Sequence, residues 1–442
     1  MLVKDFRGSK ERIIKLIDQK PSYLKGSLLP IVKYLLKKRK KILELSYRHA
    51  TPFYLFDQDE LTKSVMCFLN AFKTTLPQCK VFFAMKPNHH PYVIETVLKH
   101  GLGLDVSSGR ELKIAINHKA QNILFSGPGK TLSELEFAVK NNATTIVNID
   151  SFRELEKLAY ITRKRKKRIN AGVRIFTNHH GSWSKFGIPL AELKKIWHKA
   201  KKYSGVNLQG IQFHISWNKD ATLYEKNIKE ISDYLRKKCD AAMLRSIKFI
   251  DFGGGFLPSW SEGYYPWNLP QGKLIQLADE YFGKKTQFIN RYFISEAIGI
   301  EEFAQKISAA IKKYLEPLIR CEYFTEPGRI ICHKAMHIVL KIVDIKNSNL
   351  AITDGGTNMV GWERFEHEYY PLINLTHPST RREIPFRLYG SLCTPHDIWG
   401  YYCYAKKVEE GDILLVPYQG AYAFSLARNF IKPIPKVYIL RS

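Results

Sequence analysis

The stretch Val81-Phe-Phe-Ala-Met-Lys86-Pro-Asn-His predicts a short buried strand that ends in a lysine. Apolar residues lead up to Lys86, and Pro87 then holds that lysine at the mouth of the strand. An amine beside an apolar wall loses part of its preference for the charged form, which is what an amine nucleophile needs. A lysine at a strand end is most often simply solvated, so its meaning depends on what else reaches the same end of the fold.

From Thr51 onward, runs typical of strands alternate with runs typical of helices. The strand-like runs are 81–86, 102–107, 123–127, 145–149, 172–176, 210–215, 249–253 and 323–326. Between them lie helical runs at 91–99, 109–117, 131–140, 151–163, 189–203 and 222–237, and an earlier helix is expected at 57–69. This alternation predicts an α/β fold, a (β/α)8 TIM-type barrel, with functional groups at the carboxyl ends of its strands.

Beyond Arg329 the pattern changes to short strands separated by turn residues, at 337–346, 350–353, 386–390, 412–417 and 436–441. A C-terminal β-rich domain is therefore expected, which an early strand at 51–56 could join. The expected division is a basic helical extension (1–50), a connecting strand and helix (51–75), the barrel (76–330) and the β-rich domain (331–442). The long interval before the last barrel strand holds Trp260, Tyr264, Tyr265 and Trp267, and we expect it to form a loop over the barrel mouth.

The composition is that of an ordinary globular protein, because 45% of the 442 residues are hydrophobic and 25% are charged. The seven cysteines are widely spaced and form no CxxC pair, which argues against a disulfide framework and against a zinc site. No segment approaches 18 consecutive apolar residues, and the N-terminus has no apolar signal region. These features favour a reducing compartment and a cytoplasmic location.

Basic residues are in large excess, with 69 Lys and Arg against 41 Asp and Glu, a net charge of +28. Such a balance raises nucleic acid, an anionic membrane or an acidic substrate as partners. The densest basic runs, at 37–41 and 163–168, lack interleaved aromatics, so no specific nucleic-acid binding is expected. Residues 27–47 predict an amphipathic basic helix, for which covering the main body is favoured over peripheral membrane contact.

The predicted strand ends carry a set of residues that rarely coincides by chance: Lys86, Asp105, Arg174, His214, Ser216, Gly253, Gly254, Gly255, Glu326, Gly328 and Arg329. Three glycines and Arg329 suit a phosphate. Glu326 suits a pyridine nitrogen, and His214 suits the face of a flat ring. Each has a structural alternative: a tight turn for the glycines, an ion pair for Glu326, or a satisfied core histidine for His214. Together with the amine of Lys86, they indicate a Schiff-base site for pyridoxal 5'-phosphate.

With these residues the chain resembles the alanine-racemase-like, or fold type III, pyridoxal-phosphate decarboxylases. This group includes the diaminopimelate, ornithine and arginine decarboxylases. The resemblance runs from about Thr51 to the C-terminus. It is carried by Phe83-Ala-Met-Lys-Pro-Asn88, Leu104-Asp-Val-Ser-Ser-Gly-Arg-Glu-Leu112, Ser126-Gly-Pro-Gly-Lys-Thr131, Ser184-Lys-Phe-Gly-Ile188, Phe213-His214, Gly253-Gly-Gly255, Glu326-Pro-Gly-Arg329, Asp354-Gly-Gly356, Gly390-Ser-Leu-Cys393 with Asp397, and Gly420-Ala-Tyr422.

The resemblance implies that Lys86 holds the cofactor, that His214 stacks on its ring and that Glu326 faces its nitrogen. It places the glycine loop, Arg329 and Tyr422 around the phosphate, with Asp105 and Arg174 ordering the lysine and the histidine. It also implies a homodimer, in which the β domain of one chain lends Cys393 to the other chain's site. That thiol is expected to return a proton to the carbanion after carbon dioxide leaves.

The substrate pocket departs from its relatives. Diaminopimelate decarboxylases carry a Glu after this cysteine and ornithine decarboxylases an Asp, whereas this chain has Thr394. Trp362 and Glu366 replace an expected Arg and Tyr, with Arg364 and Tyr369 displaced. The expected substrate-binding residues are Arg329, Arg364, Thr394, His396, Asp397 and Tyr422, with His367 and Arg428 also near the pocket.

Basic groups suit a distal carboxylate better than a distal ammonium, because like charges repel in a confined site. A citryl-amino acid intermediate of siderophore assembly is therefore one candidate substrate, and diaminopimelate is disfavoured. A diaminopimelate or basic amino-acid decarboxylase is the alternative, and an inactive homologue acting as a binding or regulatory subunit is a third hypothesis. Racemase activity is disfavoured, because racemases of this fold use an arginine where Glu326 stands.

Overall fold

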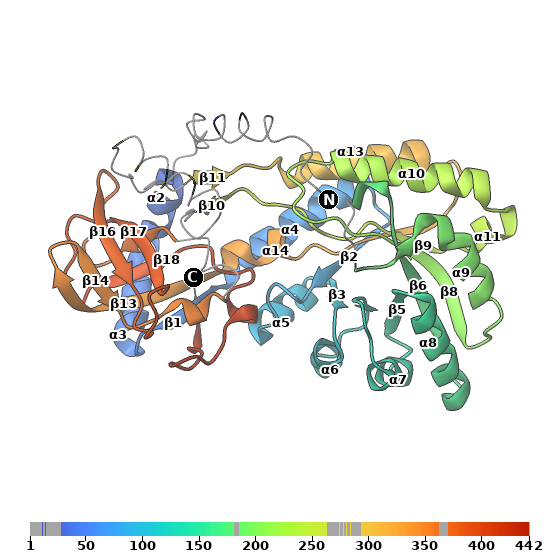
Figure 1. The fold of residues 1–442 in the computed structure, drawn as a ribbon, viewed down its shortest axis with the longest axis horizontal. Coiled ribbons are helices and arrows are strands. Elements are labelled where there is room, and N and C mark those ends of the chain that lie inside the picture. Colours follow the sequence, from blue (N-terminus) through green and yellow to red (C-terminus); the bar gives the residue numbers. More distant parts are fainter. Residues whose placement is uncertain are drawn as a thin grey trace.

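The computed structural model describes residues 28–180, 185–262, 293–361 and 370–441, together with positions 11, 14, 274, 277, 280 and 283. It is elongated, with a barrel at one end and a β-rich sheet at the other (Figure 1). Helix α4 (Gln58–Thr75) lies between these two parts (Figure 1). Among the described residues, no helix is long and apolar enough to cross a membrane.

The barrel consists of strands that pair in parallel around a closed circle. The strands are β2 (Cys79–Ala84), β3 (Gly103–Val106), β4 (Ile123–Phe125), β5 (Thr145–Ile149), β6 (Ile169–Phe176), β8 (Val206–Gln212), β9 (Phe249–Asp251) and β12 (Glu322–Thr325). The pairing of β5 with β6, and of β12 with β2, closes the circle. All their carboxyl ends therefore meet at one rim, and the predicted fold class is confirmed.

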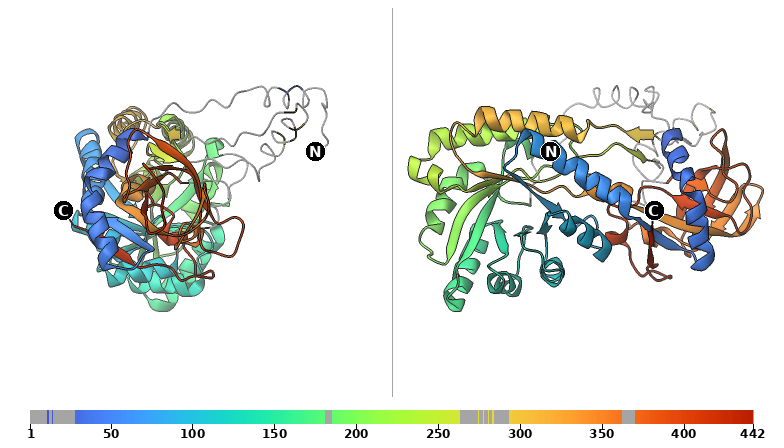
Figure 2. Two further views of the ribbon diagram at one scale, coloured as in Figure 1. Left: turned by 90° about the vertical axis from the view of Figure 1, so that its left-hand side faces the viewer. Right: turned by 180° about the vertical axis from the view of Figure 1, so that it is seen from behind.

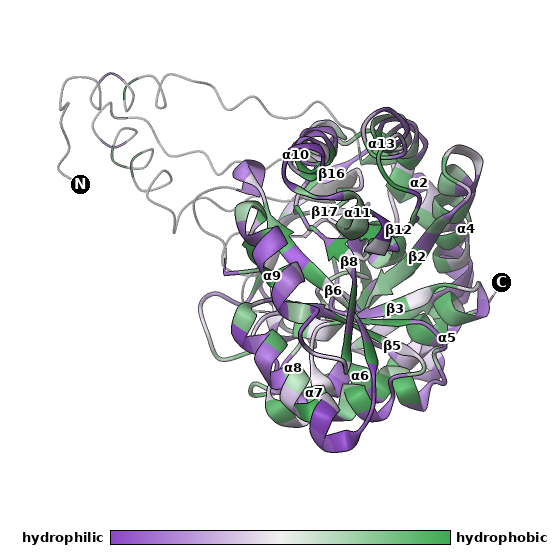
Figure 3. Cartoon of the chain, turned by 90° about the vertical axis from the view of Figure 1, so that its right-hand side faces the viewer, coloured by the Kyte–Doolittle hydropathy of each residue, from purple (hydrophilic) through white to green (hydrophobic). Residues whose placement is uncertain are grey.

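Helices surround the barrel, as Figure 3 shows from its outer end. They are α5 (Pro91–Lys99), α6 (Gly109–Asn117), α7 (Leu132–Lys140), α8 (Phe152–Arg165), α9 (Leu193–Ala200), α10 (Thr222–Lys238), α11 (Ala241–Ser246), α13 (Ile300–Tyr314) and the short α14 (Arg329–Cys332). Several begin at an N-cap, because the side chains of Ser108, Thr131 and Ser151 each accept a hydrogen bond from the N–H three residues on.

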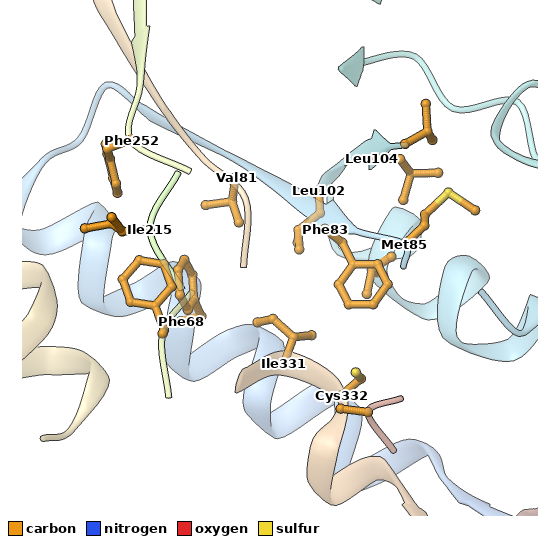
Figure 4. Packing of buried hydrophobic residues seen from close by; sticks show 14 of the residues in the cluster. Phe68, Val81, Phe83, Met85, Leu102, Leu104, Ile215, Phe252, Ile331 and Cys332 are labelled. Carbon is orange, nitrogen blue, oxygen red and sulfur yellow. The ribbon is translucent and has the colours of Figure 1, made fainter. Parts of the chain in front are cut away.

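The strand that leads to the lysine is packed on its apolar neighbours. Phe83 and Met85 have no solvent exposure, and they lie near Leu104 of β3 and Ile331 of α14 (Figure 4). Removing the ring of a buried phenylalanine such as Phe83 typically costs about 3–5 kcal/mol of stability. This packing fixes the position of the strand end, and therefore of Lys86.

The second sheet follows the order β14-β16-β17-β15-β18-β13-β1-β19. Its strands are β1 (Phe53–Asp57), β13 (Met336–Asn347), β14 (Leu350–Thr353), β15 (Leu372–Asn374), β16 (Glu383–Tyr389), β17 (Ile398–Tyr404), β18 (Ile413–Val416) and β19 (Val437–Leu440). The early strand β1 lies between β13 and β19, so the sheet joins segments from both ends of the chain. Residues from near both termini therefore share this sheet. The expected boundaries of the four segments stay a proposal.

The basic N-terminal segment folds as two helices, α2 (Leu29–Lys37) and α3 (Arg39–Arg48), rather than as the single helix expected at 27–47. The break falls at Lys38, whose amine pairs with the buried carboxylate of Asp57. Both helices lie against the β-rich sheet (Figure 2). Their apolar face, which includes Val32, Leu35 and Ile42, is buried on that sheet, so these helices cover the main body as favoured.

Some elements differ from the sequence-based expectation. The single helix expected at 189–203 is divided into β7 (Ile188–Pro189), a 3-10 turn at Leu190–Glu192 and α9, because Pro189 pairs with β6. Strands β15 and β17 were not predicted. In the long interval before the last barrel strand, β10 (Trp260–Glu262) pairs with β11 (Phe293–Ser295), while Tyr264, Tyr265 and Trp267 lie outside the described residues. Further 3-10 turns lie at Asn178–His180, His333–Ala335, Thr357–Met359 and Phe424–Leu426.

Candidate active site

Lys86 lies two residues beyond β2, on a turn that the C-terminal half of the chain holds in place. The N–H of Met85 donates to the carbonyl of Asp105 at 2.9 Å, which keeps the end of β2 on β3. The carbonyl of Pro87 accepts hydrogen bonds from the N–H of Tyr422 at 2.8 Å and from the hydroxyl of Ser425 at 2.9 Å. The lysine is therefore presented by a barrel strand and supported by the β-rich half.

Lys86 lines a cavity of about 250 Å³ at the barrel mouth. The cavity receives residues from the ends of β2, β8, β9 and β12 and from the C-terminal segment. Its lining residues are Ala84, Lys86, Pro87, His214, Ser216, Trp217, Gly255, Phe256, Leu257, Glu326, Gly328, Arg329, Tyr422 and Leu426. Many of the residues selected from the sequence thus meet at one cavity.

Glu326 is a buried carboxylate at the inner end of this cavity, with 3% of its surface exposed. The side-chain amide of Gln212 donates to both of its oxygens at 3.3 Å. Burial alone would raise the pKa of Glu326, but the neighbouring His214 and Asp251 and the charge of Arg174 lower it below its ordinary value. Glu326 is therefore ionised at neutral pH.

Two further carboxyl groups lie behind Glu326, on β3 and β9. Burial, followed by the charge of Glu326, raises the pKa of both Asp105 and Asp251 well above the ordinary value. Asp251 accepts the N–H of Gly253 at 2.9 Å, whereas Oδ1 of Asp105 has no hydrogen-bond partner within the described protein. The barrel mouth thus favours the charged form of Glu326 over that of its two carboxyl neighbours.

His214 presents a neutral ring to the cavity. Its Nδ1 accepts the N–H of Gly254 at 3.1 Å, and its Nε2 lies 3.3 Å from the hydroxyl of Ser216. Nδ1 is 3.7 Å from the nearer oxygen of Glu326, which is too far for a hydrogen bond. Burial lowers the pKa of His214 to about 4, so the imidazole carries no charge at neutral pH.

The glycines after β9 allow the chain to pass close to other strand ends. A Cβ on Gly255 would lie 1.8 Å from the carbonyl oxygen of Ile215, and one on Gly254 would lie 2.1 Å from that of Glu326. The N–H groups of Gly253 and Gly254 already donate to Asp251 and His214. Gly255 is the member of this loop that lines the cavity.

Gly328 and Arg329 follow β12. A Cβ on Gly328 would lie 2.7 Å from the ring of Pro87, so the glycine lets this strand end pack against the lysine turn. The guanidinium of Arg329 lies over two aromatic rings, 4.7 Å from the centre of Trp217 and 4.6 Å from that of Tyr422. Burial raises the pKa of Tyr422 to about 12, so its phenol stays protonated.

Arg174 and Asp105 do not line the cavity. Arg174 is on β6, and its guanidinium lies 4.4 Å from the centre of the Phe186 ring. Its charge still acts on the cavity, since it lowers the pKa of both Glu326 and His214. Asp105 pairs with Ala84 across β2 and β3, directly beside the strand that leads to the lysine.

Four predicted residues of the β-rich half, Cys393, Thr394, His396 and Asp397, lie apart from Tyr422 on the loop between β16 and β17. Cys393 and His396 are exposed there, and Thr394 is partly buried. None of these residues lines the cavity. Asp397, expected to bind substrate, is buried and accepts the N–H of Thr357 at 2.6 Å and that of Leu392 at 2.7 Å. These bonds hold the loop, and substrate binding by Asp397 stays a prediction. Arg364 and His367 lie outside the described residues.

Three site residues were not selected from the sequence: Gln212, Asp251 and Trp217. Gln212 is a fully buried amide between the buried apolar residues Ile211 and Phe213, and that polarity was the available signal. Asp251 stands at the end of β9, and a carboxylate just before three glycines was the available signal. Trp217 gave no signal, because an aromatic residue in a loop is ordinary.

The arrangement fits a flat pyridine ring that carries an aldehyde and a phosphate. An amine, an ionised carboxylate and a neutral imidazole face one cavity, and an arginine lies at its rim. The buried charge of Glu326, which lines this cavity, is a polar feature that packing alone does not explain. These residues can hold pyridoxal phosphate.

Comparison with known proteins supports this interpretation. The family model for the pyridoxal binding domain of pyridoxal-dependent decarboxylases matches residues 62–333, more than half of the chain. The diaminopimelate decarboxylase of Methanothermobacter thermautotrophicus is 25% identical over 90% of this chain and 89% of its own. The 2-[(L-alanin-3-ylcarbamoyl)methyl]-2-hydroxybutanedioate decarboxylase of Staphylococcus aureus is also 25% identical, over 86% of this chain and 91% of its own.

A solved structure shows the same fold. The diaminopimelate decarboxylase of M. jannaschii, in complex with L-lysine, superposes with a TM-score of 0.74 at 23% identity. The match covers 90% of this chain and 89% of that one. At this identity the likeness concerns the fold.

The charge state of His214 leads to a pH prediction. Because its pKa is about 4, the ring should stay neutral to below pH 5 in the folded protein, as measured by ¹³C NMR of the histidine ring. The ring signal that is absent from the spectrum of the variant His214→Gln is the signal of His214. As pH falls from 6.5 towards 4, the unfolded chain binds a proton that the folded chain does not, so this group should destabilise the fold over that range. A titration midpoint near 6.5 would contradict the burial argument.

Proposed function

Because this chain belongs to the pyridoxal-dependent decarboxylase family, we propose that it decarboxylates an amino acid or amino-acid conjugate whose far end is acidic or acylated. Pyridoxal phosphate is the cofactor of this family, and its members are carboxy-lyases. The choice of substrate rests on Thr394, an uncharged residue directly after Cys393. Diaminopimelate and ornithine decarboxylases, which this chain resembles, have an acid at this position.

The cavity residues have distinct tasks towards the cofactor. When bound, pyridoxal phosphate supplies an electron sink for the electron pair left by the departing carboxylate. Lys86 would hold its aldehyde carbon covalently, and the neutral ring of His214 would lie against the pyridine face. Glu326, already ionised, would keep a proton on the ring nitrogen. Arg329, Gly255 and Tyr422 would surround the phosphate, with Ser216 beside His214.

Asp105 and Arg174 support these groups from behind. Asp105 lies beside the strand that leads to Lys86, and Arg174 adds positive charge near both Glu326 and His214. The raised pKa values of Asp105 and Asp251 disfavour further negative charge next to Glu326, and Gln212 orients its carboxylate. These residues therefore set the charge that faces the cofactor.

A homodimer would complete the site. Cys393 is exposed on the loop between β16 and β17, and this loop does not line the cavity of its own chain. We place Cys393 of the partner subunit at the cavity, where its thiol would return a proton to the carbon that has lost the carboxylate. Buried Asp397 would hold the loop in shape, while Thr394 and His396, with Arg364, would face the substrate's far end.

The substrate proposal follows from charge. A substrate with a distal ammonium needs a buried acid, and Thr394 offers none. The Staphylococcus relative acts on an amino acid joined to a hydroxybutanedioate, whose far end carries carboxylates. A citryl-type amino-acid conjugate is therefore the preferred substrate class. Decarboxylation of diaminopimelate stays the alternative, because a relative of that activity is equally similar. A place in siderophore assembly and a cytoplasmic location stay predictions.

The shared site can be tested by complementation. An inactive Lys86→Ala chain mixed with an inactive Cys393→Ala chain should regain up to about a quarter of the wild-type activity, because half of the randomly formed dimers hold one intact site of two. The activity is measured as carbon dioxide released after the two chains are unfolded and refolded together. A mixture of Lys86→Ala with the double variant Lys86→Ala/Cys393→Ala is the matched control and should stay inactive. Mixed dimers without restored activity would contradict the shared site.

Substrate polarity can be tested at Thr394. Losing a charge-assisted bond to a distal ammonium costs about 1.5–3 kcal/mol, roughly ten- to a hundred-fold in specificity. The wild type should therefore use diaminopimelate, ornithine and lysine poorly, and Thr394→Glu or Thr394→Asp should raise kcat/KM for them while weakening use of citryl conjugates. Thr394→Val, of similar size and without charge, should leave the preference unchanged. Wild-type kcat/KM above about 10⁴ M⁻¹s⁻¹ on diaminopimelate or ornithine would refute the proposal.

A further inference from the structure

The guanidinium of Arg329 is close to two aromatic rings that come from different halves of the chain. Its guanidinium is 4.7 Å from the ring centre of Trp217, in the loop after β8, and 4.6 Å from that of Tyr422, in the C-terminal segment. All three residues line the same cavity as Lys86. The donors of a guanidinium lie in its plane, so contacts with neighbouring rings restrict the directions in which it can bind an anion.

The backbone of both aromatic residues is left-handed. Trp217 has a φ of 61° and Tyr422 a φ of 63°, a conformation that is unfavourable for bulky side chains. The indole of Trp217 is 62% exposed, so it adds little to the core. A glycine would adopt this φ without strain. A strained backbone that carries an exposed indole points to a function of the ring.

Asn218 holds the loop in this conformation. It is buried, and its N–H donates to the carbonyl of Gly255 at 3.0 Å. Its side-chain amide donates to the carbonyl of Ile215 at 3.0 Å, and its own carbonyl accepts the N–H of Leu257 at 3.0 Å. These bonds tie the loop after β8 to the loop after β9. Trp217 is therefore placed by a buried polar latch that does not involve its ring.

We propose that Trp217 is a positioning residue: its indole, together with the ring of Tyr422, orients Arg329 so that the guanidinium binds an oxyanion of the cavity's ligand. That oxyanion is either the cofactor phosphate or a carboxylate of the substrate, which share the same chemistry. The inference rests on the proposed function, because it takes this cavity to be the cofactor and substrate site. It adds a residue that the resemblance did not select.

Three variants separate the ring from the backbone. Trp217→Ala and Trp217→Gly both remove the ring, but Trp217→Gly also removes the strain of the left-handed conformation. Trp217→Phe keeps a flat ring over Arg329. If the ring matters, Trp217→Ala and Trp217→Gly should weaken ligand binding to the same extent. Trp217→Phe should largely retain it. If the ring had no part in ligand binding, Trp217→Gly would bind ligand at least as tightly as the wild type. Thermal unfolding identifies any variant that has lost its fold.

The first readout is cofactor binding. It is measured by absorbance titration of the cofactor-free protein with pyridoxal phosphate and, separately, with pyridoxal. Loss of a cation–π contact predicts about three- to thirty-fold weaker binding of the ligand that Arg329 holds. If that ligand is the phosphate, Trp217→Ala and Trp217→Gly weaken pyridoxal phosphate binding and leave pyridoxal binding unchanged. The second readout is the holoenzyme titrated with citrate, with the cofactor spectrum as the signal. Weaker citrate binding with unchanged cofactor binding assigns the carboxylate.

Folded Trp217→Ala and Trp217→Gly proteins that bind pyridoxal phosphate and citrate as tightly as the wild type would overturn the inference. Tyr160→Ala, which removes a half-exposed ring from α8, is the control and should change neither readout. Failure of the proposed function looks different, because the wild type itself would then bind no pyridoxal phosphate.

Discussion

The negative charge of Glu326 is the feature on which the arrangement of the barrel mouth depends. An isolated carboxylate buried in an apolar barrel would take up a proton, because burial disfavours the charged form. Here the amide of Gln212 donates to the carboxylate. The neighbouring His214 and the charge of Arg174 lower the pKa of Glu326. Burial and the charge of Glu326 raise the pKa of Asp105 and Asp251, which disfavours further negative charge beside Glu326. Of these three acids, Glu326 is the one that lines the cavity.

The β-rich half contributes to this site within its own chain as well as in the proposed dimer. The carbonyl of Gly420 accepts the side-chain amide of Asn88 at 2.9 Å, and the N–H of Tyr422 donates to Pro87. A Cβ on Gly420 would lie 1.7 Å from the carbonyl oxygen of Cys332, so only a glycine fits between this segment and α14. The turn that carries Lys86 is thus held between the barrel and the C-terminal segment, and displacement of either part would move the lysine.

The sequence predicted the barrel well, because alternating apolar strands and capped amphipathic helices leave a strong periodic signal. It predicted the site at the level of strand ends, since topology alone brings those ends together. Details that depend on packing across the barrel were not predictable: the amide of Gln212 on Glu326, the ring of Trp217 over Arg329 and the buried role of Asp397. Strand β17 was missed because its run of aromatic residues around Gly400 lacks the alternation typical of a strand with one buried face.

Lys86 and Lys130 both follow strands of this barrel, and of these two only Lys86 is available for chemistry. The amine of Lys130 is fully engaged, with bonds to Glu154 at 2.7 Å and to the carbonyls of Gly127 and Asn148 at 2.8 Å. Lys86 instead lines the cavity that holds Glu326 and His214. Borohydride reduction of the protein loaded with pyridoxal phosphate, followed by peptide mass mapping, tests this distinction directly. The account predicts a phosphopyridoxyl group on the peptide that contains Lys86, and recovery of the label on Lys130 or another lysine would contradict it.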